Sequence, residues 1–139
     1  MDHKLNKQEK LRSRTAVNRL FADGKSLMAF PLRAAYRIRP ADDNAAPLQF
    51  LITIPKKRIR HAVDRVQLRR RVREAYRLNR RELLVPALEQ TGLGVDIAFV
   101  YLDNSVAPYD VILEKMTSLL ERIAQAAIDY QPRQTAPQQ

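Results

Sequence analysis

Basic side chains gather in one segment of this chain. Between Lys56 and Arg81 the sequence holds twelve Lys or Arg residues and two acidic residues, which accounts for the whole net charge of +10; the other 13 basic and 13 acidic residues cancel. A charge concentrated in this way favours a polyanionic partner, because each phosphate that Lys or Arg neutralises releases counterions. Arg outnumbers Lys here, and its planar guanidinium binds phosphate at two points and stacks on bases. The segment therefore predicts a nucleic-acid-binding surface, with a merely solubilising surface as the alternative.

Side chains suited to catalysis or metal binding are few. The 139 residues include no Cys and two His, His3 and His61. The sequence therefore has no ligand for a thiolate metal site and very few residues for a His-based catalytic triad. The carboxylates of Asp42 and Asp43 stand in a turn-rich stretch, where Asp is a turn former. We therefore expect no catalytic residue in this chain.

The length suits a single domain with one buried core. No apolar run approaches the roughly 20 residues that cross a bilayer, and the N-terminal stretch Met1 to Arg14 is polar, so we expect a cytoplasmic protein without membrane contact. We expect a polar N-terminal tail over 1–12, one domain over 13–130 and a disordered tail over 131–139.

The elements that must position the basic segment follow from periodicity and turn signals. Ser13 can cap a first helix that Gly24 ends, and Pro55 stops a strand before the basic helix begins. The expected elements are a helix over 13–21, a possible short strand over 25–28, strands over 32–39 and 48–54 joined as a hairpin, a basic helix over 61–81, a strand over 95–101 buried on both faces, and a long last helix over 112–127. This order predicts an α+β sandwich, α-β-β-β-α-β-α, with helices packed on a mainly antiparallel sheet.

A helical wheel separates the two faces of the basic helix. At about 100° per residue, an apolar arc of Leu68, Val72, Ala75 and Tyr76 predicts the core face. Six guanidinium groups share the flank beside it: Arg65, Arg69, Arg70, Arg73, Arg77 and Arg80. Like charges three and four residues apart repel each other, so an isolated helix gains nothing from this pattern. It indicates a surface made for binding phosphates.

The segment KKRIRHAVDRVQLRRRVREAYR, Lys56 to Arg77, resembles the signature of the bacterial ribonuclease P protein family. That signature has two Lys, a short spacer, Ala-Val-x-Arg-Asn-Arg, an apolar residue, Lys-Arg, two residues and Arg-Glu. VNRLFADG, residues 17–24, is similar to the family's first helix and the Gly after it. Val66 and Gln67 depart from the pattern, standing where the family has Asn and Arg.

The resemblance implies a ribosomal protein S5 domain 2-like fold and the protein subunit of ribonuclease P, which removes the 5′ leader of precursor tRNA. It implies that the RNA subunit binds the catalytic Mg²⁺ and that the protein, without a cofactor of its own and monomeric, binds this RNA and the leader. The RNA-binding residues would be Lys56, Lys57, Arg60, Arg65, Arg69, Arg70, Arg73, Arg77 and Arg80. The leader-binding residues would be Phe21, Tyr36 and Val17, with Phe21 as a core residue the equal alternative.

Two other functions fit the charge alone. The first is a ribosomal or other structured-RNA-binding protein without a nuclease role. The second is a DNA-binding helix, which the Arg-rich face favours less, because it offers few side chains for reading bases.

Overall fold

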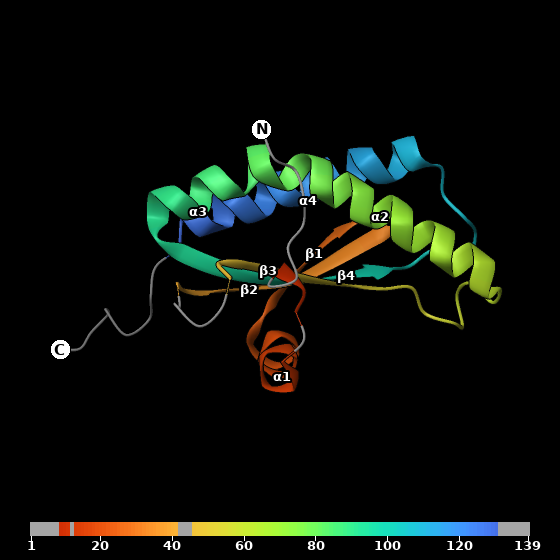
Figure 1. Ribbon diagram of the computed structural model, residues 1–139, viewed down its shortest axis with the longest axis horizontal. Helices are drawn as coiled ribbons and strands as arrows, with labels where there is room; N and C mark the ends of the chain where they lie inside the picture. The colour runs from red at the N-terminus through yellow and green to blue at the C-terminus, as the bar shows by residue number, and fades with distance from the viewer. Residues whose placement is uncertain (1–8, 12, 42–45, 131–139) are drawn as a thin grey trace.

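The computed structural model describes residues 9–11, 13–41 and 46–130 of the chain. Within these residues, a four-stranded sheet carries three helices on one face and one on the other (Figure 1). The elements are α1 (Arg14–Asp23), β1 (Lys25–Ala29), β2 (Leu32–Pro40), β3 (Leu48–Thr53), α2 (Ala62–Leu83), α3 (Val85–Thr91), β4 (Leu93–Tyr101) and α4 (Tyr109–Ile128). The predicted order is confirmed, with the short α3 added where Pro86 starts a new helical turn.

The sheet has the strand order β1-β2-β4-β3. β2 is antiparallel to both β1 and β4, whereas β3 is parallel to β4. The predicted hairpin between residues 32–39 and 48–54 is therefore wrong: β4, buried almost throughout, lies between these strands. A parallel neighbour needs a crossover connection, and α2 supplies it between β3 and β4. The basic helix is thus the main element of the crossover that joins β3 to β4, with α3 between it and β4.

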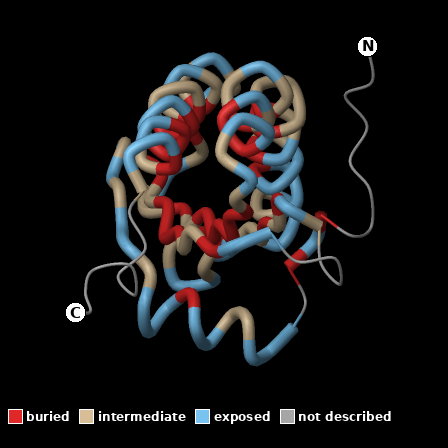
Figure 2. The backbone as a smooth tube through the Cα atoms, turned by 90° about the vertical axis from the view of Figure 1, so that its left-hand side faces the viewer, coloured by how far each residue is buried: buried red, intermediate tan, exposed pale blue. Residues whose placement is uncertain are grey.

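The main core lies between the sheet and the helices α2 and α4. Leu68, Val72 and Tyr76 of α2 are fully buried, as are the apolar residues that recur every three or four positions along α4. The Tyr76 ring packs between Phe50, tilted against it with a centroid distance of 4.5 Å, and Phe99, edge-to-face at 5.4 Å. Figure 2 shows the buried residues concentrated between these helices and the sheet. The core face predicted for the basic helix is confirmed.

Helix α1 packs alone on the opposite face of the sheet (Figure 1). The Ser13 side chain accepts a hydrogen bond from the Ala16 amide at 3.2 Å, as its predicted capping role requires. Leu20 is buried against Ala35 and Ala98 in a small second cluster. Gly24 allows the chain to turn straight into β1, because a Cβ there would collide with the Leu20 carbonyl oxygen.

The chain already joins the sheet before α1. The Leu11 amide donates to the Phe50 carbonyl at 2.8 Å, and Lys10 forms a parallel bridge with the same residue. Leu11 is buried in the cluster beneath α1, and Glu9 is buried beside α2. Residues 9–11 are therefore part of the domain and not of a polar tail, which corrects the expected boundary at residue 13. The expected tail over 131–139, His3 and the turn at Asp42 and Asp43 lie outside the described residues.

Within the described parts of the chain, no helix has both the length and the apolar character needed to span a bilayer.

Candidate nucleic-acid interface

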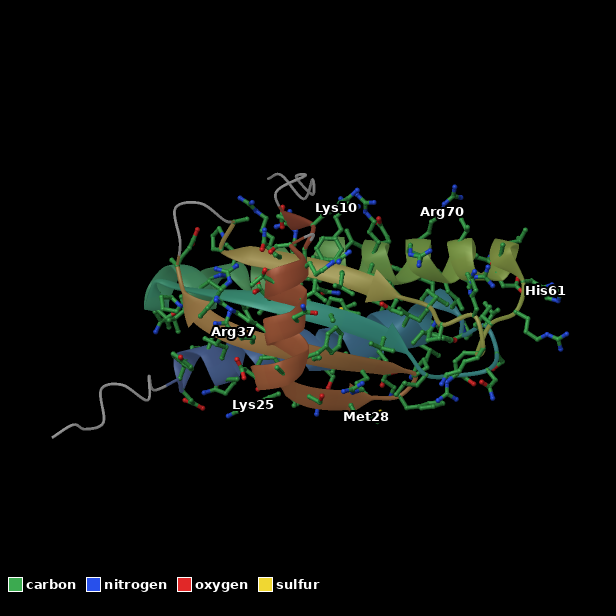
Figure 3. All side chains as sticks on the ribbon, turned by 90° about the horizontal axis from the view of Figure 1, so that it is seen from below. Lys10, Lys25, Met28, Arg37, His61 and Arg70 are labelled. Atoms are coloured by element: carbon green, nitrogen blue, oxygen red, sulfur yellow. The ribbon has the colours of Figure 1, made fainter. Side chains whose placement is uncertain are left out.

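The outer face of α2 presents guanidinium groups that have no side-chain partner among the described residues. Arg69, Arg70 and Arg73 are exposed, and among the described residues their side chains make no ion pair or hydrogen bond. Arg70 points away from the body of the protein in Figure 3, near the edge that Lys10 also occupies. Spaced over about one turn at 1.5 Å per residue, the three groups offer closely spaced positive charges to a chain of phosphates.

The loop before α2 extends this charge. Lys56, Lys57 and Arg60 are exposed, as the sequence predicted for RNA-binding residues. A shallow depression lies between this loop and the one after β4, lined by Lys57, Arg58 and Asn104. Arg58 faces the Asn104 side-chain oxygen across this depression at 3.5 Å. The cationic surface therefore runs from the end of β3 onto the first four turns of α2.

Arg65 ties the start of the helix to this loop. Its Nη1 donates to the carbonyl oxygens of Ile59 and Arg60, each at 2.9 Å. These bonds use one end of the guanidinium to hold the loop in place. Arg65 thus shapes the surface that carries Lys56 and Lys57.

Arg77 is partly neutralised on the same helix. Its Nη2 and Nε donate to the two carboxylate oxygens of Glu74 at 2.7 and 3.0 Å. This hydrogen bond lowers the pKa of Glu74 and raises the pKa of Arg77. Any phosphate at Arg77 must therefore compete with a carboxylate.

Arg80 belongs to the interior of the fold. Its side chain is 8% exposed, and its Nε lies 3.3 Å from Oε1 of Glu9, whose side chain is 10% exposed. The prediction that the Arg80 side chain points outward is therefore wrong. A helical wheel considers one helix alone and could not show that residues 9–11 pack over this turn of α2. Arg71, which the prediction omitted, reaches the loop between β4 and α4, where its Nη1 donates to the Ala107 carbonyl oxygen at 2.7 Å. Both Arg residues hold elements together.

Tyr36 lies on the face of the sheet that α2 and α4 cover. It alternates with Ala35, which faces α1, so its ring enters the main core and is 6% exposed. Burial raises the pKa of its hydroxyl. The expectation that Tyr36 offers its ring to the leader is wrong, since α2 and α4 cover that face of the sheet. Its ring cannot stack on an unpaired base in this structure.

Phe21 is 52% exposed, so the alternative that it is a core residue is wrong. Figure 3 shows α1 crossing the sheet from the side of Lys10 to the side of Lys25, with Arg37 on one side of it and Met28 on the other. In a right-handed helix whose Leu20 faces the sheet, Val17 and Phe21 lie about 60° and 100° round from it, on the flank toward Met28.

Further exposed groups lie on that side of α1. Met28 and Phe30, at the end of β1 and the turn after it, are 55% and 57% exposed. Arg33, opposite Met28 in the sheet, is half-buried and donates to the Ser26 hydroxyl at 3.1 Å. Sequence reasoning missed Met28 and Phe30. The signal for them was a short strand that mixes polar and apolar residues and ends in a Phe-Pro turn, a pattern that indicates an exposed edge of the sheet. Aromatic, apolar and cationic groups thus meet beside α1.

The described residues contain no group of three or more His, Cys, Asp or Glu side chains placed to hold a metal ion. His61 is exposed at the N-terminus of α2 and makes no side-chain cap there. The geometry offers binding groups for phosphates and bases.

Comparisons with known proteins point to one family. The family model described as "Ribonuclease P" matches residues 5–124. The chain is 37% identical over 120 residues to the ribonuclease P protein component of Porphyromonas gingivalis, covering 86% of each chain. It is 29% identical over 127 residues to that of Chlorobium phaeobacteroides, covering 86% of this chain and 87% of the relative.

Solved structures show the same fold. The ribonuclease P protein from Thermotoga maritima superposes with a TM-score of 0.64 at 25% identity, covering 82% of this chain and 96% of that one. The protein from Staphylococcus aureus superposes with a TM-score of 0.62 at 15% identity, covering 84% and 95%, and supports the fold alone.

Proposed function

This chain belongs to the ribonuclease P protein family and is the protein component of that endoribonuclease, and we propose that Arg69, Arg70 and Arg73 bind the phosphates of ribonuclease P RNA together with Lys56, Lys57 and Arg60. The observation that carries the proposal is the row of exposed cations on α2 and the preceding loop, whose side chains have no partner within the part of the chain that the structure describes. Arg65 supports this surface from behind. The alternative of a ribosomal protein without a nuclease role is not favoured by the relatives.

We further propose that the flank of α1 that carries Val17 and Phe21 binds the unpaired 5′ leader of precursor tRNA. A half-exposed Phe ring is a platform on which any base can stack, worth about 1 to 3 kcal/mol per base. Arg33, on the sheet beside this flank, is placed to offset the charge of the leader backbone. Tyr36, buried on the other face, has no part in this surface.

In this proposal the chemistry belongs to the RNA subunit, which holds the catalytic Mg²⁺. The protein side chains contribute position and charge, and the chain works as a monomer in the cytoplasm. The described residues offer neither a metal-binding cluster nor a Cys, and His61, their one His, is exposed at a helix start, which supports a binding role.

The leader proposal is tested by the variant Phe21→Ala in the reconstituted enzyme. Binding of precursor tRNA should weaken about fivefold or more, and binding of mature tRNA should be unchanged, because only the precursor offers a base to stack. The melting temperature should stay near that of the wild type, since the ring is exposed.

Tyr36→Phe is the matched control, because it changes a buried aromatic residue on the opposite face and should leave leader binding unchanged. Equal weakening of precursor and mature tRNA by Phe21→Ala would place the leader elsewhere.

A further inference from the structure

Two valines stand exposed inside the cationic surface of α2. Val63 is 78% exposed and Val66 is 47% exposed. Being three residues apart, they are neighbours on the helix surface, and Val66 is followed by Arg69 and Arg70 at the spacings that bring side chains together. The pair therefore forms an apolar strip bordered by guanidinium groups.

Within the described residues, neither valine contributes to the packing of the fold. Neither belongs to a buried cluster or packs against one. A β-branched residue is also a poorer choice than Arg, Lys or Gln at an exposed helix position, because the helix restricts its rotamers. One exposed valine is ordinary, but a contiguous pair within the most cationic segment of the chain calls for a partner that covers it.

The charge around the strip identifies the partner as a polyanion. Exposed cations lie before it at Arg60 and after it at Arg69 and Arg70. A nucleic acid held at its phosphates by these groups brings its ribose and base surfaces between them. These are the apolar parts of RNA, and they complement a side chain that can neither donate nor accept a hydrogen bond.

We propose that Val63 and Val66 pack against ribose or base surfaces of ribonuclease P RNA and supply a part of the affinity that does not depend on salt. The inference rests on the proposed function in one respect, that α2 faces this RNA. Phosphate contacts release counterions and weaken steeply with salt, whereas the burial of valine does not. The two kinds of contact on one helix can therefore be told apart by titration.

The experiment measures affinity for the ribonuclease P RNA of the same genome at several salt concentrations, using the full chain. Val63→Ser/Val66→Ser should bind roughly threefold to tenfold more weakly at every salt concentration, with an unchanged slope of log affinity against log salt. Arg69→Ala/Arg70→Ala/Arg73→Ala should bind more weakly with a slope flatter by about two to three. Ser and Val have similar helix propensity, so the helix should remain intact, which melting curves check.

Two single variants complete the test. Val66→Leu keeps an apolar side chain and should retain the wild-type affinity; a loss as large as that of the serine variant would show that the contact is not apolar and overturn the inference. Ile128→Ser, at a residue 45% exposed at the end of α4, is the matched control and should not change binding.

The two proposals fail in different ways. If the serine variant binds like the wild type while the triple Arg variant flattens the slope, the valines have no role and the phosphate surface stands. If the triple Arg variant keeps the wild-type slope, α2 does not face the RNA and both proposals are wrong.

Discussion

Replacing Arg80 with Ala should lower the free energy of unfolding of the protein but should leave the salt dependence of its RNA affinity unchanged. The Arg80 side chain is 8% exposed and pairs with Glu9, whose side chain is 10% exposed, so the variant removes one partner of a buried ion pair. Removing one partner of a buried pair costs about 3 to 5 kcal/mol, and the lower end applies because both groups keep some contact with water. For a domain of this size about 3 kcal/mol lowers Tm by roughly 10 °C.

The assay combines urea or thermal unfolding with RNA titrations at several salt concentrations, at a temperature where the variant is folded. Arg70→Ala is the matched control: its side chain is exposed, so its stability should change by less than about 0.5 kcal/mol while the salt slope falls by about 0.9. If Arg80→Ala melted like the wild type and lowered the slope as Arg70→Ala does, Arg80 would be an RNA contact and the ion pair with Glu9 would be unimportant.

Two further predictions concern other ion pairs. Glu74→Gln should release Arg77 to a phosphate, steepening the salt slope by up to about 0.9 and tightening RNA binding at low salt. The change in Tm should be small, because the pair is only half-buried and water screens it; an unchanged slope in the titration would count against the prediction. Asp96→Asn should cost about 3 kcal/mol in urea unfolding, because the Asp96 side chain is 2% exposed and its Oδ1 lies 2.9 Å from Nη2 of the buried Arg39. A loss below about 1 kcal/mol would show that Arg39 finds other partners.

The helices and the strand limits could be read from the sequence because each leaves a local pattern. Ser13 and Gly24 bracket α1, and the apolar spacing along α4 has the helical period. The pairing of the strands could not be read in this way. β2 and β3 are close in sequence, but β4 is buried on both faces and takes the central position between them.

The candidate site was predicted best where exposure depends on one helix alone. Arg69, Arg70 and Arg73 are exposed because the wheel places them away from the core of α2. Arg80 shares their flank but is buried by Glu9, a contact between residues far apart in sequence. Tyr36 shows the same limit, since alternation along a strand gives its face but not which helices cover that face.

Cleavage of precursor tRNA at low Mg²⁺ tests the central claim most directly, comparing this protein alone, ribonuclease P RNA alone and the two together. We expect no cleavage by the protein alone, slow cleavage by the RNA alone and fast cleavage at the leader junction by the mixture, with the gain lost in Arg69→Ala/Arg70→Ala/Arg73→Ala. Cleavage by the RNA-free protein, or a triple Arg variant as effective as the wild type, would contradict the assignment of chemistry to the RNA and of RNA binding to α2.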